Sequence, residues 1–244
     1  SYSTRWFFVL SGIGFVMKKF LRFFLLLLSV LIFIPMLYVW ILGFLPIGNT
    51  ALMQLRYSEA GRDTSFHVQH AWVSYDEISR HLKLAVICTE DPNFHKHMGF
   101  DFKAIEQARE YNKTHENKRG ASTISQQTAK NVFLWPGRNY VRKGFEAYFT
   151  YLMEICWSKK RILEVYLNSI EMGNGIFGAQ AAAQKYFKKN AANLTMYEAA
   201  LIAVSLPNPR KLNPAHPGPY MVKRAWWVVS YMKKYGHLLT AIEQ

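Results

Sequence analysis

Two polar segments, residues 90–99 and 120–131, hold the side chains of this sequence that are best suited to chemistry. The first segment places the adjacent carboxylates of Glu90 and Asp91 near an aromatic ring, two imidazoles and a glycine. A carboxyl group can take or give a proton in a reaction when its pKa lies near the working pH. The first segment therefore predicts a general acid or base.

The second segment supplies groups that bind anions and hydroxyls. Its hydroxyls and amides stand where we expect a helix to begin, with Ser122 as the N-cap. Thr123, Gln127 and Lys130 follow at i, i+4 and i+7, a spacing that places them on one helix face. Because a helix N-terminus presents free N–H groups and a positive dipole end, this face suits a phosphate group.

The helix that leads to Glu90 must carry a buried stripe. Ser74 and Glu77 form a capping box that we expect to open this helix. The stripe that follows is formed by Ile78, Leu82, Ala85 and Val86. Adjacent acids at a helix end are often only solvated, but this stripe turns Glu90 inward. Partial desolvation and the negative end of the helix dipole should both raise the pKa of Glu90.

A helix predicted from residue 140 to residue 157 carries a third charged group. Arg142 and Lys143 lie four and three residues before Glu146, so the three charges share one face. The same spacing is typical of an ordinary set of salt bridges within a helix. Lys130 and Arg138 are, taken alone, equally compatible with surface cations.

A long apolar segment precedes all of these residues. No charged residue lies between Arg22 and Arg56, and residues 23–45 are almost wholly apolar. A helix of about 20 residues crosses the hydrocarbon core of a bilayer, and Pro35 is tolerated in such a helix. We therefore expect one N-terminal transmembrane helix over residues 23–45, preceded by a cytoplasmic segment over residues 1–22.

Basic residues beside this segment predict its orientation. Lys18, Lys19 and Arg22 stand just before it, and the positive-inside rule then gives a cytoplasmic N-terminus and an exported C-terminal domain. A cleaved signal peptide is the alternative, but its apolar region would be shorter and would end in small residues. Residues 1–16 precede Met17, a natural start for the anchor, and receive no function.

The composition is that of a membrane anchor and one packed domain. The 244 residues are 50% hydrophobic, and the net charge of +14 suits nucleic acid, anionic lipid or a phosphate-bearing substrate. The anchor argues against nucleic acid. After a connector over residues 46–75, the helical period dominates residues 76–244 and predicts a mostly α domain. Cys88 and Cys156 fall on predicted apolar helix faces, so we expect free buried thiols rather than a disulfide.

Four ordered motifs gather these residues within residues 70–235. E-D-x-x-F-x-x-H-x-G is filled by Glu90, Asp91, Phe94, His97 and Gly99. G-x-S-T-[IL]-[ST]-Q-Q with a following K-N is filled by Gly120, Ser122, Thr123, Ile124, Ser125, Gln126, Gln127, Lys130 and Asn131. R-K-x-x-E is filled by Arg142, Lys143 and Glu146, and K-x-x-I-L-E-x-Y-L-N by Lys159, Ile162, Leu163, Glu164, Tyr166, Leu167 and Asn168. A fifth motif, R-x-x-x-V-L, is only approximate, with Arg224, Val228 and Val229.

In this order and spacing the motifs resemble those of the family 51 glycosyltransferases, the peptidoglycan polymerases. The resemblance implies a lysozyme-like α fold with a large head and a smaller jaw that dips into the membrane, the connector leading into the jaw. It implies that Glu90 is a general base for the 4-hydroxyl of the N-acetylglucosamine of lipid II. That oxygen would attack C1 of the terminal N-acetylmuramic acid of the growing chain, release undecaprenyl diphosphate and invert the anomeric centre.

The resemblance also assigns roles to the other motif residues. Glu146 would be a second catalytic carboxylate that orients the cations or the donor sugar-phosphate. Asp91 and His97 would support Glu90 and the loop around it. The implied substrate-binding set comprises Asp91, Phe94, His97, Ser122, Thr123, Gln126, Gln127, Lys130, Arg138, Arg142 and Lys143. Its cations suit a diphosphate leaving group, which needs positive charge to depart.

Cofactor, partners and location follow from the same resemblance. Many family members are helped by a divalent cation, which implies Mg²⁺ or Mn²⁺, although no dedicated metal-ligand motif and no organic cofactor motif is present. The expected partners are lipid II, the growing lipid-linked chain and inner-membrane lipids, with cell-wall elongation or division proteins as further candidates. The exported domain would be periplasmic, and without a K-T-G motif we expect no transpeptidase activity.

Two other functions remain open at this point. A lysozyme-like glycan-cleaving enzyme also uses a glutamate of raised pKa on an α domain. It has no diphosphate to stabilise, so Lys130, Arg138 and Lys143 would have no task. A non-catalytic scaffold that binds lipid II is the second alternative, and it would have no need of Glu90 and Glu146.

Overall fold

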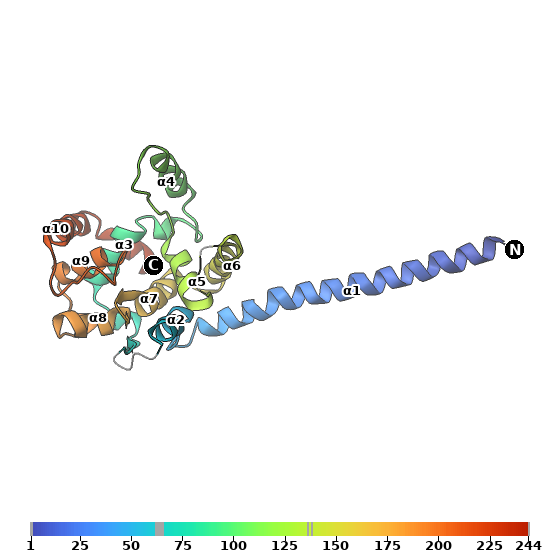
Figure 1. The fold of residues 1–244 in the computed structure, drawn as a ribbon, viewed down its shortest axis with the longest axis horizontal. Helices are drawn as coiled ribbons and strands as arrows, with labels where there is room; N and C mark the ends of the chain where they lie inside the picture. Colours follow the sequence, from blue (N-terminus) through green and yellow to red (C-terminus); the bar gives the residue numbers. More distant parts are fainter. Residues whose placement is uncertain (1, 62–65, 136, 138, 244) are drawn as a thin grey trace.

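A computed structural model describes residues 2–61, 66–135, 137 and 139–243, and this part of the chain is mostly α, as predicted. One long helix, α1 (Tyr2–Leu42), projects from a body built of shorter helices (Figure 1). Its stretch Met17–Leu42 is long and apolar enough to cross a membrane. The helix ends at Leu42, short of the predicted end at residue 45.

The body begins with α2 (Ala51–Ala60) and contains the following elements. The first half holds β1 (Gln69–His70), the 3₁₀ turn η1 (Tyr75–Glu77), α3 (Arg80–Glu90), η2 (Phe94–Lys96), α4 (Phe102–Thr114), α5 (Ile124–Phe133) and α6 (Tyr140–Cys156). The second half holds α7 (Lys159–Ser169), β2 (Glu171–Gly173), β3 (Ile176–Phe177), α8 (Gly178–Phe187), η3 (Ala191–Asn193), α9 (Met196–Ser205), α10 (Pro219–Lys234) and α11 (His237–Glu243). The small sheet has the order β1-β3-β2, with β1 parallel and β2 antiparallel to β3.

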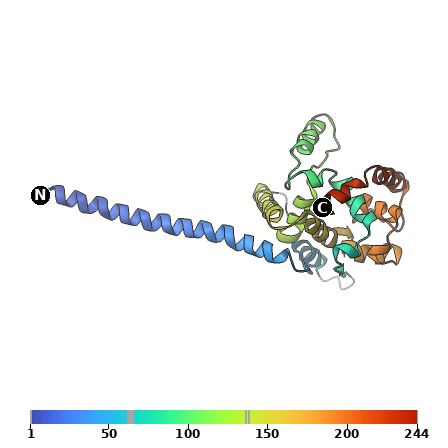
Figure 2. The same ribbon diagram turned by 180° about the vertical axis from the view of Figure 1, so that it is seen from behind.

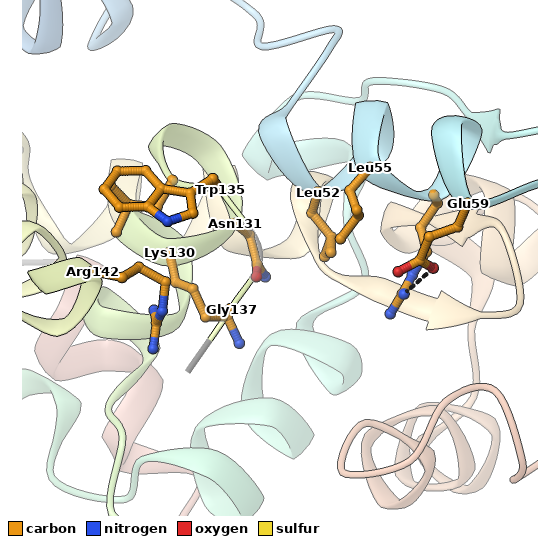
Figure 3. Close-up of a pocket in the computed structure, with 10 residues that line it drawn as sticks. Leu52, Leu55, Glu59, Lys130, Asn131, Trp135, Gly137 and Arg142 are labelled. Atoms are coloured by element: carbon orange, nitrogen blue, oxygen red, sulfur yellow. Dashed lines mark hydrogen bonds and ion pairs between the residues drawn. The ribbon is translucent and has the colours of Figure 1, made fainter. Parts of the chain in front are cut away.

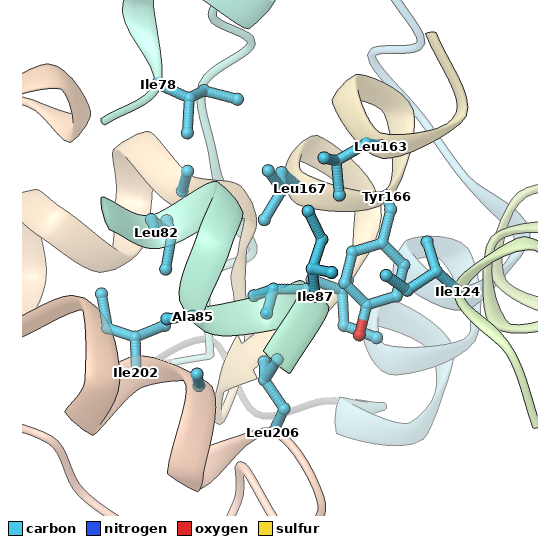
Figure 4. Close-up of a cluster of buried hydrophobic side chains, with 14 of the residues drawn as sticks. Ile78, Leu82, Ala85, Ile87, Ile124, Leu163, Tyr166, Leu167, Ile202 and Leu206 are labelled. Carbon is cyan, nitrogen blue, oxygen red and sulfur yellow. The ribbon is translucent and has the colours of Figure 1, made fainter. Parts of the chain in front are cut away.

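Helix α3 lies at the centre of the body, where it packs against α9, α10 and α11. Every residue from Leu82 to Cys88 is buried, so this helix is enclosed on all sides. Figure 4 shows its side chains between those of α7, with Leu163 and Leu167, and those of α9, with Ile202. This packing fixes the C-terminal end of α3, where Glu90 lies.

Helix α1 contacts α6 through a backbone carbonyl that lacks its usual hydrogen-bond donor within α1 itself. Pro35 has no N–H, so the carbonyl of Leu31 loses its helical donor. The hydroxyl of Tyr148 in α6 donates to that carbonyl at 3.0 Å. A side chain from the body of the protein therefore replaces the hydrogen-bond donor that the proline lacks.

Two further side chains hold the end of α1. The indole Nε1 of Trp157 donates to the carbonyl of Val39 at 2.7 Å. The guanidinium of Arg161 in α7 donates to the carbonyl of Leu42 at 2.8 Å, and also to that of Leu45. A cation at a helix C-terminus also complements the helix dipole. The anchor helix thus meets the body at a defined junction.

Two predicted helix starts differ from the structure. The Ser74–Glu77 capping box is present but opens the short turn η1, whereas Ser79 caps α3 by accepting from two backbone N–H groups. Thr123, and not Ser122, caps α5, because Thr123 forms a reciprocal capping box with the third residue of the helix. In both cases the predicted helix start is displaced, because the segment before the helix contains a second residue that can act as the N-cap.

The two cysteines are free thiols, as predicted. Cys88 is buried in α3, where desolvation raises its pKa to about 12. Cys156 is only partly buried, and desolvation raises its pKa as well. Because the thiolate is the reactive form, both thiols should be inert near neutral pH.

Gly178, at the start of α8, should tolerate no side chain. Its φ is +80°, and an added Cβ would lie 2.7 Å from the backbone oxygen of Asn168, which cannot rotate away. We expect Gly178→Ala to lower the free energy of unfolding by about 2–4 kcal/mol. Gly144→Ala is the matched control, because its Cβ meets nothing within 4 Å in the middle of α6. Equal denaturation midpoints for the two variants would contradict this packing.

Candidate active site

The surface beside Glu90 is a cleft formed by two adjoining cavities. A cavity of about 680 Å³ is lined by Glu90, by Gln127 of α5 and by residues of α2. A second cavity of about 590 Å³ continues from it toward Arg142 of α6. The two cavities share Lys130, and Figure 3 shows this lysine and Arg142 across the second cavity from the side chains of α2. The cleft therefore has a carboxylate at one end and cations along its length.

Glu90 also reaches a smaller cavity on its other side. This cavity, of about 290 Å³, lies between Glu90, the residues of α4 and segment 119–123. Helix α4 has no buried residue and projects from the body like an arm (Figures 1 and 2). Glu90 thus stands at the junction of two spaces, each of which can receive one reactant.

The carboxylate of Glu90 is oriented by a single side chain. Gln127 donates from Nε2 to Oε2 of Glu90 at 2.8 Å, and its own Oε1 accepts from the hydroxyl of Tyr166 at 3.3 Å. Tyr166 is fully buried, so it fixes the side-chain amide of Gln127 with the N–H groups toward Glu90. The glutamate therefore has one hydrogen bond and no paired cation among the described residues.

Burial raises the pKa of Glu90, as predicted. Desolvation is the largest cause, and the negative charge of Asp91 acts in the same direction. The hydrogen bond from Gln127 and the charge of Lys130 oppose the rise. A carboxylate in this state is a stronger base than a solvated glutamate.

Asp91 has the opposite surroundings. Its carboxylate is buried and accepts from the backbone N–H of Ile124, the first residue of α5, at 3.0 Å. It also accepts from Nε2 of His97 at 3.0 Å. Phe94 is fully buried against the ring of His97. These three predicted site residues therefore join the end of α3 to the start of α5 beneath the cleft.

Residues of the fourth motif complete this support. Lys159 donates from Nζ to the carbonyl of His97 at 2.6 Å and pairs with Glu154 at 2.8 Å. Glu154 also accepts from the hydroxyl of Ser125 in α5 at 2.5 Å. The paired groups under Glu90 thus form one connected polar network, in which Nδ1 of His97 is buried and has no hydrogen-bond partner among the described residues.

The predicted binding residues at the start of α5 and along it divide into two sets. Thr123 and Gln126 are buried and use their side chains for the capping box, and Thr123 also donates to the carbonyl of Gly99 at 2.6 Å. Ser122, Gln127 and Lys130 line the main cleft instead. The first set shapes the start of the helix, and the second set is placed where it can contact a ligand.

The charged group on α6 forms as the spacing predicted. Glu146 is buried, pairs with Arg142 at 2.7 Å and contacts the ammonium of Lys143. Desolvation and the positive charges of Arg142, Lys143 and Arg56 lower the pKa of Lys130, while the charge of Glu146 opposes this effect. Cations held close enough to repel one another make a site for an anion. Arg138, predicted to belong to this set, lies outside the residues that the structure describes.

Several residues of the cleft were not predicted as site residues, and three of them have polar side chains of interest. Arg56 and Glu171 come from α2 and β2, and both line the cavity beside Glu90. Asn131 is only 1% exposed, lines both cavities, and has no hydrogen-bond partner for either side-chain amide atom among the described residues. Asn131 belongs to the second motif, which was a signal for it. Arg56 lies outside all motifs, in the predicted connector.

The described residues offer no built metal site. No group of three or more histidine, cysteine, aspartate or glutamate side chains among them is arranged to hold a metal ion. Asp91, the acid beside Glu90, already accepts from His97 and from the start of α5. The described side chains of the cleft therefore provide no preformed set of ligands for Mg²⁺ or Mn²⁺.

A desolvated carboxylate lies between two cavities, one of them lined by cations, an arrangement suited to moving a proton beside a bound anionic group. The transglycosylase family model matches residues 59–233, and the chain belongs to this family. A biosynthetic peptidoglycan transglycosylase of Bacteroides thetaiotaomicron is 50% identical over 218 residues, which cover 88% of this chain and 87% of the relative.

Two further relatives carry the same name. The Bdellovibrio bacteriovorus protein is 52% identical over 188 residues, which cover 77% of this chain and 75% of the relative. The Pseudomonas savastanoi protein is 49% identical over 201 residues, which cover 82% of this chain and 85% of the relative. The predicted family and the lysozyme-like fold class are therefore confirmed.

The raised pKa of Glu90 has a consequence for stability. Above the ordinary glutamate pKa of 4.5 the unfolded chain carries the ionised carboxylate at no cost, whereas the folded chain must desolvate it. The penalty is absent below that pH, grows as the pH rises toward the raised pKa, and is constant above it. We expect Glu90→Gln, which removes the charge, to raise the Tm by roughly 2–4 °C at neutral pH.

Thermal denaturation of both proteins from pH 4 to pH 8 measures this effect. The gain should disappear as the pH falls to the ordinary range of glutamate. A Tm for Glu90→Gln at or below that of the parent protein at neutral pH would show that Glu90 is not desolvated.

Proposed function

We propose that this chain polymerises lipid II into linear peptidoglycan glycan strands, with Glu90 as the general base. The observation that carries the proposal is the placement of Glu90 between a cation-lined cleft and a smaller polar cavity. Membership of the transglycosylase family and the names of the relatives support the same reaction.

Glu90 starts the reaction by removing a proton. Its carboxylate takes the proton of the 4-hydroxyl of the acceptor N-acetylglucosamine as that oxygen attacks C1 of the donor N-acetylmuramic acid. The bond between C1 and the diphosphate oxygen breaks, and undecaprenyl diphosphate leaves with the electron pair. Attack from the face opposite to the leaving group converts the α anomer into the β linkage. Glu90 then returns its proton to solvent.

The cations stabilise the leaving group. Negative charge accumulates on the diphosphate as the bond to C1 breaks, and fixed cations beside it lower the barrier. Lys130 lies along the cleft between Glu90 and Arg142, and it takes this position in the reaction. Glu146 holds Arg142 and Lys143 in place from below. A divalent cation would act here through the diphosphate oxygens and not through a protein cage.

The cations also favour polymerisation over the two alternatives. A glycan-cleaving enzyme has no diphosphate to hold, so the charges around Lys130 would only repel one another. A non-catalytic scaffold would have no use for a desolvated base such as Glu90, which costs stability. Both features are explained together only by transfer of a sugar from a diphosphate.

The anchor brings the cleft to the substrate. Helix α1 crosses the inner membrane with its N-terminus in the cytoplasm, and the body works on the periplasmic side, where lipid-linked substrate is exposed. Helix α6 adds an exposed apolar stripe that suits the membrane surface, formed by Tyr140, Val141, Phe145, Tyr151 and Ile155. Cell-wall elongation or division proteins are further candidates for contact with the exposed side chains of α1.

The general base is tested by Glu90→Gln, which keeps the shape of the side chain and its contact with Gln127. We expect the variant to convert labelled lipid II in detergent at least about 100-fold more slowly than the parent protein. Product of the parent protein should be cut by lysozyme. Polymer formed by a folded Glu90→Gln protein at the parent rate would contradict the role of Glu90, and no polymer from the parent protein would contradict the proposed function.

The leaving-group site is tested by Lys130→Ala. We expect kcat for lipid II conversion to fall by about 100-fold, because charge on the departing diphosphate is no longer balanced. Lys113→Ala on α4 is the control, since that lysine is exposed and, within the part of the chain that the structure describes, pairs only with Glu110. A fall of the same size in the control, or unchanged turnover by Lys130→Ala, would argue against a leaving-group role for Lys130.

A further inference from the structure

Arg56 brings a cation into the cleft from outside the motifs. It belongs to α2, the first helix after the membrane anchor, and it lines both cavities of the cleft together with Lys130. Its positive charge is one of those that lower the pKa of Lys130. Arg56 also precedes residues 59–233, the part of the chain that matches the family model. Its role therefore has to be argued from its own contacts.

Two carboxylates hold Arg56, and their surroundings differ. Glu171 is 4% exposed, accepts from Nε of Arg56 at 2.8 Å, and accepts from the backbone N–H of Gly175 with its other oxygen. Glu59 is 45% exposed and accepts from Nη1 of Arg56 at 2.7 Å. Glu171 is thus a fixed partner in the protein interior, whereas Glu59 is a partner at the surface.

Glu59 has a second cation within reach. Nη1 of Arg210, a residue that follows α9, lies 3.8 Å from the same carboxylate oxygen that Arg56 contacts. Both Glu59 and Arg210 are about half exposed, so their side chains can move without breaking the core. Nη2 of Arg56 has no hydrogen bond to any residue that the structure describes. Among the described residues, the guanidinium therefore has one terminal nitrogen without a partner and one held by an exchangeable partner.

We propose that Arg56 binds the diphosphate of the lipid-linked substrate and that Glu59 is an exchangeable counter-ion which occupies Arg56 until the diphosphate arrives. This inference rests on the proposed function. The planar guanidinium matches two phosphate oxygens with its two terminal nitrogens, while its Nε stays on Glu171. Glu59 leaves Arg56 and pairs with Arg210 when the diphosphate binds.

The position of α2 explains why such a cation is useful. The diphosphate of a lipid-linked sugar lies at the membrane surface, and α2 follows the membrane anchor directly. Lys130 and Arg142 face the same cavity from α5 and α6 (Figure 3). Arg56 faces it from α2, so a diphosphate bound there would meet cations from three helices. Glu59 keeps the empty cleft from carrying an unpaired excess of positive charge.

The exchange makes two predictions of opposite sign. Glu59→Gln removes the competing carboxylate and should bind the diphosphate roughly two- to fivefold more tightly. Arg56→Lys keeps a positive charge for the buried Glu171 but loses the planar pair of donors, and it should bind roughly tenfold more weakly. Loss of a carboxylate that lines the cavity favours an anion by itself, so the exchange requires that the Arg56 variant also binds more weakly.

Binding of undecaprenyl diphosphate to the full chain in detergent tests the proposal, with lipid II conversion measured on the same preparations. Undecaprenol, which has the same tail without phosphate, should show no difference between the variants. Glu110→Gln, an exposed acid on α4 that pairs with Lys113, should leave binding unchanged. The Tm of Arg56→Lys shows whether that variant stays folded.

The outcomes separate the two proposals. Tighter binding by Glu59→Gln together with weaker binding by Arg56→Lys supports the exchange. Unchanged binding by Glu59→Gln, in a preparation whose parent protein binds the diphosphate and makes polymer, overturns the exchange and leaves the proposed function in place. If the parent protein neither binds undecaprenyl diphosphate nor converts lipid II, the proposed function falls, and the role of Arg56 falls with it.

Discussion

The active site depends on the opposite surroundings of two adjacent carboxylates at the end of α3. Asp91 is buried, accepts from His97 and from the first N–H of α5, and so ties the end of one helix to the start of another. Glu90, one residue before it, has a single hydrogen bond from Gln127 and faces the cleft. Asp91 therefore supports the structure, while Glu90 is left available to a ligand in the cleft. Different surroundings of two nearby carboxyl groups are a common way for proteins to give them different pKa values.

The same division explains the cost of the site. Asp91 stabilises the fold because its hydrogen bonds are satisfied, and its loss would leave buried donors unpaired. Glu90 works against the fold because its carboxylate is desolvated and no cation among the described residues forms an ion pair with it. Packing of α3 offsets the free-energy cost of desolvating Glu90, because its buried side chains from Leu82 to Cys88 hold the end of the helix in place. Stability elsewhere thus permits a strained charge in the cleft.

The anchor is part of this arrangement and not a loose tether. Tyr148 and Trp157 donate to carbonyls of α1, and Arg161 holds the end of that helix. Tyr148 belongs to α6, the helix that carries the cations around Glu146. The position of those cations relative to α1 is therefore set by packing.

Much of the fold and the site could be predicted from residue types and spacing. The mostly α class, the raised pKa of Glu90 and the salt-bridged Glu146 all follow from helical periodicity and from simple electrostatics. Local competition was harder to predict: Thr123 caps α5 in place of Ser122, because a neighbouring residue offered a second, reciprocal bond. Such choices depend on small energy differences between adjacent positions.

Long-range contacts could not be predicted from the sequence at all. Arg56 enters the cleft because α2 packs beside α5, and Glu171 meets it from a strand far along the chain. Neither residue lies in a pattern with a chemical meaning of its own. The carbonyl freed by Pro35 was predictable, but its donor, Tyr148, was not, because only tertiary packing brings α6 to that point.

The pH dependence of kcat/KM for lipid II conversion tests the central claim, a desolvated Glu90 acting as base, most directly. Activity should fall on the acid side with a midpoint above the ordinary glutamate pKa of 4.5. In Gln127→Ala the midpoint should move to higher pH, because the hydrogen bond that favours the charged form is lost. A midpoint at or below 4.5 in the parent protein, or a downward shift in the variant, would contradict the account.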